Sequence, residues 1–232
     1  MALTLGTGPF GERPAGEFNF DAPRADVSYV EDSPRWIRVR LGGETVADSR
    51  RMKMLHRSGK LPVYLFPPED VRRELIPEDA VREHGRLLEL DFHAMDEWLE
   101  EDEQLFGHAR DPYHRIDTRR TSRAVRVSIG GRTVAETTRA TVLFETGLPP
   151  RWYIPREDIR AELEPSDHRT ACAYKGHATH FTAAGEEAVA WSYEDPLLDA
   201  APVKDLVAFY DERVDLEIDG EPQERPRTPW SR

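Results

Sequence analysis

The sequence predicts a mainly β protein built from two tandem small β-sheet or barrel-like units, each with one short helical turn. Three observations predict this fold class: a long segment of the chain recurs at a constant spacing, apolar residues alternate with polar ones inside it, and a glycine pair interrupts the alternation. Alternation with a period of two indicates a strand with one buried face. A glycine pair supplies the positive φ angles that a tight hairpin turn needs.

The recurring segment covers residues 38–75 and 126–163, which align without a gap at an offset of 88. Identical residues include the glycine pairs, Gly42-Gly43 and Gly130-Gly131, and the Thr-Val-Ala run that follows each pair. An ungapped match of this length indicates an internal duplication, which has to be recognised before any element is assigned.

Each copy is predicted to contain a first strand, a return strand after the glycine pair, a third strand that ends at proline, and one helical turn. In the first and second copies the first strand is expected at 37–41 and 125–129, and the return strand at 45–47 and 133–135. The third strand is expected at 63–66 and 152–154, and the helical turn at 68–75 and 156–163. Acidic residues begin both helical turns, where they complement the helix dipole.

After these segments the copies differ. The second is predicted to form three more strands, in CAYKGHATHFTA, VAWSYEDPL and VAFYDERVDLEIDG, whereas the first passes quickly to LLELDFHAMDEW. Matching Met95-Asp96 to Val214-Asp215 changes the offset to 119, so the first copy is predicted to lack 31 residues. Contacts with the second copy or with another chain are expected to replace its missing strands.

The expected organisation has five parts. They are an extended N-terminal arm at 1–33, a truncated first repeat at 34–98, a linker at 99–120, a complete second repeat at 121–222 and a loose tail at 223–232. The net charge of −12 argues against general binding to nucleic acids or anionic membranes, which would repel the chain. A local basic run is interpreted as a solvated linker; its members are Arg115, Arg119, Arg120, Arg123 and Arg126.

Cys172 is the only cysteine, which excludes an intramolecular disulfide and a structural CxxC zinc site. The first residues have no apolar core of the signal-peptide type, and no run approaches the ~20 apolar residues of a membrane span. A cytoplasmic protein with no membrane association and no cofactor is therefore the expectation.

Several motifs together are specific enough to indicate a family. They are LGTGPFGERPAG, EDSPR, GGETVADSRR, LPVYLFP, EEDE with DPYHRID, FETGLP, CAYKG, WSYEDP and VAFYDERVD. With them the chain resembles, over most of residues 1–220, the DUF427 family of bacterial proteins of unknown function, in which the domain often occurs in tandem. A nucleotidyltransferase label is sometimes attached to that domain.

The chain departs from the family pattern at four places. The resemblance implies a cysteine-proline pair before Tyr-Lys-Gly, where this chain has Cys172-Ala173, and an aromatic pair after it, where this chain has His180-Phe181. The first copy lacks its own Tyr-Lys-Gly and Trp-Ser-Tyr stretches, and Arg57 stands opposite Glu145. The first copy is therefore interpreted as structural support.

The candidate ligand-binding residues lie in the second copy. They are Glu145, Tyr153, Cys172, Tyr174, Lys175, Gly176, Trp191, Tyr193 and Asp195. Lys175 has the chemistry of a nucleophile with a lowered pKa or of an anion anchor. Glu145 could act as an acid, as a base or as a partner that orients Lys175. Trp191 and Tyr193 lie on one face of a predicted strand and could stack on a flat ligand. In the structural alternative, Trp191 and Tyr193 are core residues and Lys175 forms an ion pair with Glu145.

Three functions remain open: binding of a small polar metabolite around Lys175, with or without catalysis; a structural or protein-interaction module; and a nucleotide-handling protein. No metal site is expected, because His177 and His180 point to opposite faces of a strand. Nucleotidyl transfer has little support, since the chain has no Gly-rich loop ending in Lys-Ser/Thr and no close carboxylate pair after Gly-Ser. The acidic residues Asp215, Glu217 and Asp219 are interpreted as the solvated face of a terminal strand.

Overall fold

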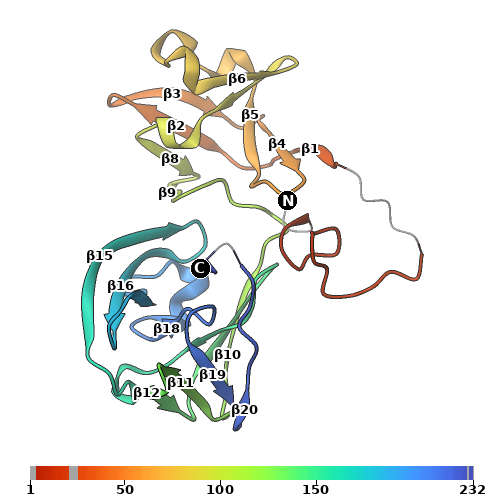
Figure 1. Ribbon diagram of the computed structural model, residues 1–232. Helices are drawn as coiled ribbons and strands as arrows, with labels where there is room; N and C mark the ends of the chain where they lie inside the picture. Colours follow the sequence, from red (N-terminus) through yellow and green to blue (C-terminus); the bar gives the residue numbers. More distant parts are fainter. Residues whose placement is uncertain (1–3, 21–25, 229, 232) are drawn as a thin grey trace. The chain divides into compact units, whose positions relative to one another are not determined.

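The computed structural model describes residues 4–20, 26–228 and 230–231 and divides into two compact units, Met1–His114 and Arg115–Arg232 (Figure 1). The predicted mainly β fold is confirmed: antiparallel strands build both units, with short 3-10 turns between them, and each sheet is open rather than barrel-like. Parts of the predicted arm (1–3 and 21–25) and tail (229 and 232) lie outside the described residues.

The first unit contains two antiparallel sheets. One has the order β1-β4-β5-β7-β6 and the other β3-β2-β8-β9. The strands are β1 Ser28–Asp32, β2 Ile37–Leu41, β3 Glu44–Ser49, β4 Lys53–Arg57, β5 Val63–Phe66, β6 Val81–His84, β7 Leu87–Leu90, β8 Glu97–Glu100 and β9 Glu103–Gln104. The 3-10 turns are η2 Pro68–Asp70, η3 Arg73–Leu75, η4 Glu78–Ala80 and η5 Phe92–Ala94.

The second unit contains three sheets, with the orders β10-β13-β14, β12-β11-β19-β20 and β15-β16-β17-β18. The strands are β10 Ile116–Arg120, β11 Val125–Ile129, β12 Arg132–Thr137, β13 Thr141–Glu145, β14 Arg151–Tyr153, β15 Leu163–Cys172, β16 Gly176–Ala183, β17 Glu186–Ser192, β18 Val207–Phe209, β19 Asp215–Ile218 and β20 Glu221–Pro222. The 3-10 turns are η6 Arg156–Asp158 and η7 Leu198–Val203. Reciprocal backbone hydrogen bonds between Ile154 and Val207 join the end of β14 to β18.

The strands of the two units have the same bounds after addition of 88 to the residue number, from β1–β4 in the first unit to β10–β13 in the second. Details repeat as well. The first hairpin of each unit has a register shift at the same place, after Val39 or after Val127. The aspartate that ends the 3-10 turn, Asp70 or Asp158, accepts a hydrogen bond from an arginine 19 residues earlier, Arg51 between β3 and β4 or Arg139 between β12 and β13.

The closing strand follows a different offset from the predicted one. In the first unit Val39 pairs with Trp98 of β8, and in the second Val127 pairs with Leu216 of β19. The structural offset is therefore 118, not 119, and the first unit is shorter by 30 residues. A shift of one residue moves every side chain to the opposite face of the strand, and the backbone pairing shows which frame the two units share.

The first unit supplies its own replacement for the missing strands. Its β6–β7 hairpin pairs with β5, through Leu65 with Glu89 and Phe66 with Leu88. The same part of the second unit contains the four-stranded sheet β15–β18. Contacts with the second unit or with another chain, which were expected from the sequence, are therefore not needed to replace these strands.

Several strands lie where none was predicted. The predicted arm contains β1, the predicted linker contains β9 and β10, and β4 and β13 follow the return strands directly. β1 and β10 are edge strands with mostly polar residues and no fully buried one, so they lack the alternation that reveals a half-buried strand. Each unit also has more 3-10 turns than the single helical turn expected.

The predicted loose tail is fastened to the second unit at the residues that the structure describes. Arg225 pairs with Asp215 at 2.8 Å, and the Thr228 hydroxyl donates to Glu212 at 2.6 Å. None of the helical turns within residues 4–20, 26–228 and 230–231 has the length and hydropathy that a membrane crossing needs.

The glycine pairs lead to a first prediction. Gly43 has φ +81°, a left-handed conformation that costs an L side chain about 1–2 kcal/mol. Gly43→Ala should therefore lower the midpoint of urea unfolding of the first unit. Gly16→Ala is the control, because no atom lies within 4 Å of its added Cβ and its φ is not positive. Equal effects of the two substitutions would contradict this account of the turn.

Candidate functional site

The candidate residues come from the ends of strands in the second unit. Glu145 ends β13, Tyr153 ends β14 and Cys172 ends β15, while Lys175 immediately precedes β16. Trp191 lies near the end of β17, and Tyr193 follows that strand. Because antiparallel neighbours bring successive strand ends to common edges, residues up to 48 positions apart in the chain are brought together.

The centre of the site is an ion pair between Lys175 and Glu145. The Nζ atom of Lys175 donates to Oε2 of Glu145 at 2.5 Å, and the two side chains are only 9% and 8% exposed. Burial lowers the pKa of Lys175, but the adjacent Glu145 carboxylate, with Cys172 and Tyr153, outweighs it, so that the pKa lies above the ordinary lysine value. Lys175 is thus held as an ammonium, which suits an anchor and not a nucleophile with a lowered pKa.

Tyr153 and Trp191 form one wall of the site. The indole Nε1 of Trp191 donates to the Tyr153 hydroxyl at 3.2 Å, and the two rings meet edge to face with centroids 6.2 Å apart. Burial raises the pKa of Tyr153 to about 12. Trp191 also packs on Tyr210, with centroids 4.6 Å apart, so its faces are largely occupied by protein.

Tyr193 differs from its neighbours in its hydroxyl group. The side chain is buried, and burial raises its pKa well above that of a free tyrosine. Tyr153, Cys172 and Glu145 lie close enough to add to this shift. Among the residues that the structure describes, Trp191 and Lys175 each make a side-chain hydrogen bond within the cluster, whereas none is found for the Tyr193 hydroxyl.

The turn between β15 and β16 positions Lys175. The backbone N–H of Tyr174 points at the Cys172 sulfur at 3.5 Å, and the Lys175 carbonyl accepts from Leu197 N at 3.1 Å. Gly176 has φ +88°, and its added Cβ would lie 3.5 Å from the Asp195 carbonyl. That distance is an ordinary contact, so it is the positive φ that requires glycine here.

The structure therefore brings six of the nine candidate side chains to one place and leaves three at its margin. The six are Glu145, Tyr153, Cys172, Lys175, Trp191 and Tyr193, here called the Lys175 cluster. Tyr174 is buried in the turn, Gly176 shapes it, and the Asp195 side chain is exposed. Cys172 is half-buried, with a free thiol.

Sequence reasoning missed a second buried charge network beside this cluster. Arg151 donates from Nη1 to Asp211 at 3.2 Å and from both Nη atoms to Glu212, at 2.9 and 2.5 Å. All three side chains are less than a tenth exposed. Opposite charges 60 residues apart carry no signal in a single sequence, although the acidic pair after the buried β18 was a visible clue.

His180 is buried on β16, and His177 is exposed on the same strand, as the sequence predicted for their opposite orientation. Nε2 of His180 lies 2.9 Å from the Thr170 hydroxyl. Burial, with the nearby His168 and Arg169, lowers the pKa of His180 to about 4, so the ring is neutral at pH 7. Within the described part of the chain, no group of three His, Cys, Asp or Glu side chains is placed to hold a metal ion.

The first unit has a differently built ion pair at the equivalent place. Arg57 stands at the position of Glu145, and its partner is the buried Glu89 of β7, at 3.4 Å. Glu89 also accepts from Arg82 at 3.3 Å and contacts His84 at 2.7 Å. The first unit therefore keeps a buried charge pair while lacking the residues of the Lys175 cluster.

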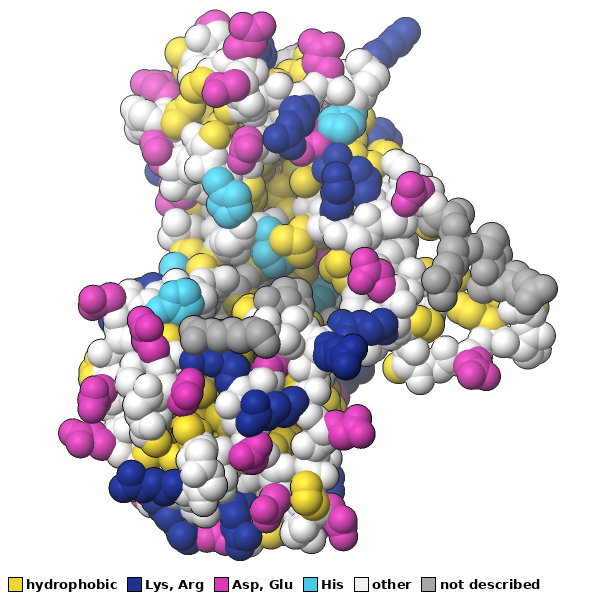
Figure 2. Space-filling view, viewed as in Figure 1, with side chains coloured by type: hydrophobic (Ala, Val, Ile, Leu, Met, Phe, Trp, Pro, Cys, Tyr) yellow, Lys and Arg dark blue, Asp and Glu magenta, His cyan; other side chains and the backbone are white. Residues whose placement is uncertain are grey.

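The basic run predicted as a linker is part of the second unit and is ion-paired. Arg115 and Arg119 pair with Asp117, Arg123 with Asp219, and Arg126 with Glu136 and Glu217. Figure 2 shows acidic and basic side chains interspersed on the visible face of both units. These contacts neutralise the local excess of positive charge.

Fold and site together define a class: a protein of open antiparallel sheets in which the second unit encloses a charged and aromatic cluster. A family model described as a domain of unknown function, DUF427, matches residues 29–85 and 117–220, more than half of the chain. The protein belongs to the DUF427 family, which confirms the resemblance seen in the motifs. The second matched range includes all nine candidate residues. No curated protein matches the chain.

The buried pair predicts an asymmetry between single and double substitutions. Lys175→Met leaves the Glu145 carboxylate buried without its cation and should lower the free energy of unfolding by about 3–5 kcal/mol. Lys175→Met with Glu145→Leu removes both charges and should recover most of that loss. Chemical denaturation followed by tryptophan fluorescence measures both. A single variant as stable as the wild type would show that the pair is solvated and not buried.

Asp211 predicts a pH dependence. Burial raises the pKa of its carboxyl from 3.8 to about 7, although Arg151 acts to lower it. The folded state therefore binds this proton more tightly than the unfolded state, so the contribution of Asp211 to stability declines as the pH rises from about 4 to about 7. Asp211→Asn removes this titrating group. The free energy of unfolding of the wild type minus that of the variant should therefore fall as the pH rises from about 4 to about 7. Parallel curves for wild type and variant would contradict the assignment.

Proposed function

We propose that the second unit binds a small polar metabolite at the Lys175 cluster. The observation that carries the proposal is the buried Lys175–Glu145 pair beside the Tyr193 hydroxyl, for which no partner is recorded among the described residues. A buried ion pair adds little net stability compared with apolar residues of the same volume. Buried ionisable groups that perturb one another are, for that reason, candidates for a functional site.

The chemistry of the cluster favours a ligand with hydrogen-bond acceptors. An ammonium has three N–H donors, and Glu145 is the side-chain acceptor recorded for Lys175 among the described residues. The Tyr193 hydroxyl adds a donor, and the half-buried Cys172 marks the side from which a ligand would approach. A carboxylate, phosphate or carbonyl oxygen would satisfy both donors. A protonated lysine anchors such a group; it does not attack it.

A structural or protein-interaction module is the second candidate function, and the long edge strand β15 favours it. β15 pairs only with β16 within the described residues and is mostly exposed, and Figure 1 shows it along the margin of its sheet. Three features disfavour the addition of another strand at this edge: Pro165, a register shift before Arg169, and several charged residues. The edge therefore ranks below the Lys175 cluster.

Nucleotide handling ranks third. The alternating acidic residues on and after β19 are held in surface ion pairs: Asp215 with Arg225, Glu217 with Arg126 and Asp219 with Arg123. They do not form the convergent carboxylate pair that would hold two magnesium ions for in-line displacement. Nucleotides remain in the ligand screen because their phosphates suit Lys175.

We place the proposed ligand binding in the cytoplasm, where the free thiol of Cys172 stays reduced.

A thermal-shift screen of the wild type and Tyr193→Phe against carboxylates, organic phosphates and nucleotides tests the proposal. Tyr193→Phe removes one hydroxyl without a recorded partner, so its own melting temperature should stay within about a degree of the wild type. A ligand that stabilises the wild type by mass action should bind the variant about tenfold more weakly, the loss expected for one hydrogen bond to a charged group.

The control is Tyr210→Phe, which alters an aromatic neighbour of Trp191 outside the Lys175 cluster. It should bind the same ligand with unchanged affinity. A ligand that binds wild type and Tyr193→Phe equally well would move the site elsewhere. A wild type that no compound stabilises would leave the cluster a purely structural feature, and the interaction module would become the better proposal.

A further inference from the structure

The first unit contains a cavity of about 190 Å³ whose lining residues all lie between Leu61 and Ala109. It is formed by β5, β7, η5 and β8, together with Gly107, His108 and Ala109. We propose that this cavity is a second ligand site, distinct from the Lys175 cluster, and that it binds a small zwitterion of the α-amino acid type with an apolar side chain.

The apolar wall of the cavity is a fixed aromatic stack. Phe92 and Trp98 lie nearly parallel, with an interplanar angle of 7° and ring centroids 4.9 Å apart. Nε1 of Trp98 donates to the Phe92 carbonyl at 3.0 Å, which holds the stack in place. Leu61, which is 49% exposed, adds a half-open apolar edge. A preformed apolar wall of this kind binds an apolar side chain with little loss of conformational entropy.

The polar wall carries both signs of charge. Arg82 and Glu89 are cross-strand partners in the β6–β7 hairpin, so their side chains share a face, and Asp91 follows Glu89 by two residues. Glu89 pairs with Arg82 and also with Arg57, which lies outside the lining. With Glu89 paired from outside the cavity, Arg82 and Asp91 leave one positive and one negative charge on the wall, which favours a ligand that is neutral overall but charged at two points.

Each charge has spare hydrogen-bonding capacity. The guanidinium of Arg82 is 62% exposed and uses Nη1 for Glu89, and a guanidinium has five N–H donors. Its remaining edge suits a carboxylate, which arginine binds through two parallel hydrogen bonds. One oxygen of Asp91 accepts from His93 N at 2.9 Å. Its second oxygen, with no recorded partner among the described residues, suits an ammonium.

The size of the cavity limits the ligand. A cavity of about 150 Å³ is sufficient to bind benzene, whereas pockets for drug-sized molecules measure about 300–1,000 Å³. A volume of about 190 Å³ therefore fits one amino acid and excludes a nucleotide.

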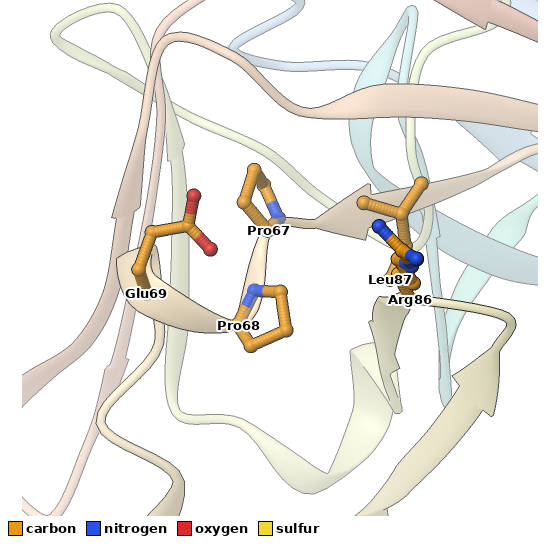
Figure 3. A pocket seen from close by; sticks show the side chains of 5 residues that line it. All are labelled: Pro67, Pro68, Glu69, Arg86 and Leu87. Carbon is orange, nitrogen blue, oxygen red and sulfur yellow. The ribbon is translucent and has the colours of Figure 1, made fainter.

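A larger hollow in the same unit, of about 530 Å³, lacks these features. Figure 3 shows Glu69 on one side of it and Arg86 with Leu87 on the other, with Pro67 and Pro68 between them. Glu69 already pairs with Arg51 at 3.3 Å, and no aromatic ring contributes to the lining. This hollow supplies matched control positions.

Isothermal titration of the full chain with L-phenylalanine and L-leucine tests the proposal, with phenylpropionate and phenethylamine as probes that each lack one of the two charges. The amino acids should bind at least tenfold more tightly than either probe, because each charge-assisted hydrogen bond contributes about 1.5–3 kcal/mol. Arg82→Gln should weaken amino acid binding about tenfold. Asp91→Asn should do the same and abolish the preference over phenylpropionate, since asparagine still caps η5.

Two further variants keep the test decisive. Leu61→Trp, at a half-exposed position, should fill the cavity and abolish binding without lowering the melting temperature. Arg86→Gln should bind amino acids like the wild type, because it alters the larger hollow. The proposal is overturned if neither amino acid binds at millimolar concentration, if both one-charge probes bind as tightly as the amino acids, or if Arg86→Gln weakens binding as much as Arg82→Gln.

Discussion

The ion pair between Lys175 and Glu145 is the constraint on which the architecture of the second unit depends. It joins the sheet of β10, β13 and β14 to the sheet of β15–β18 through two side chains that are almost fully withdrawn from water. Neither charge is stable there without the other, so the turn that presents Lys175 has to hold one geometry. The positive φ of Gly176 and the hydrogen bond from Leu197 to the Lys175 carbonyl both serve that geometry. Tyrosine and tryptophan suit the surrounding positions because they combine apolar bulk with a polar group that can face the charges.

The first unit meets the same requirement with opposite signs. Arg57 occupies the place of Glu145, and the acidic partner comes from β7, which pairs with β5 in the space used by β18 in the second unit. A cation on one copy and an anion on the other, at equivalent positions, indicate that this end of the sheet tolerates charge only as a pair. The change of partner also changes which residues each unit presents. Lys175, Tyr193 and the thiol have no counterparts, while the hairpin that replaces them carries Arg82, Glu89 and Asp91 on one face.

The sequence predicted the elements whose signals are local. The glycine pairs located both hairpins, and the alternation around Val39 and Val127 located the strands beside them. The motifs CAYKG and WSYEDP contain four of the six side chains that the fold brings together, and FETGLP contains a fifth, Glu145. The ion pair between Lys175 and Glu145, expected in the structural alternative, is present in the structure. The sequence could not reveal β1 and β10, because an edge strand with two solvated faces has no apolar period. Nor could it pair Arg151 with Asp211 and Glu212, or show that the shorter unit contains a cavity, since both depend on contacts between distant segments.

The two units place their charged groups in different surroundings. In the second unit the charged groups are enclosed with aromatic rings, so a ligand there has to compete with Glu145 for the lysine or add to it through the Tyr193 hydroxyl. In the first unit the exposed edge of Arg82 and one oxygen of Asp91 face an open cavity, so a ligand adds contacts without displacing any. Binding at the enclosed site is therefore coupled to the stability of the second unit, because the same ion pair serves both. The site proposed at the cavity uses no residue of that ion pair, so substitutions at either proposed site leave the residues of the other in place.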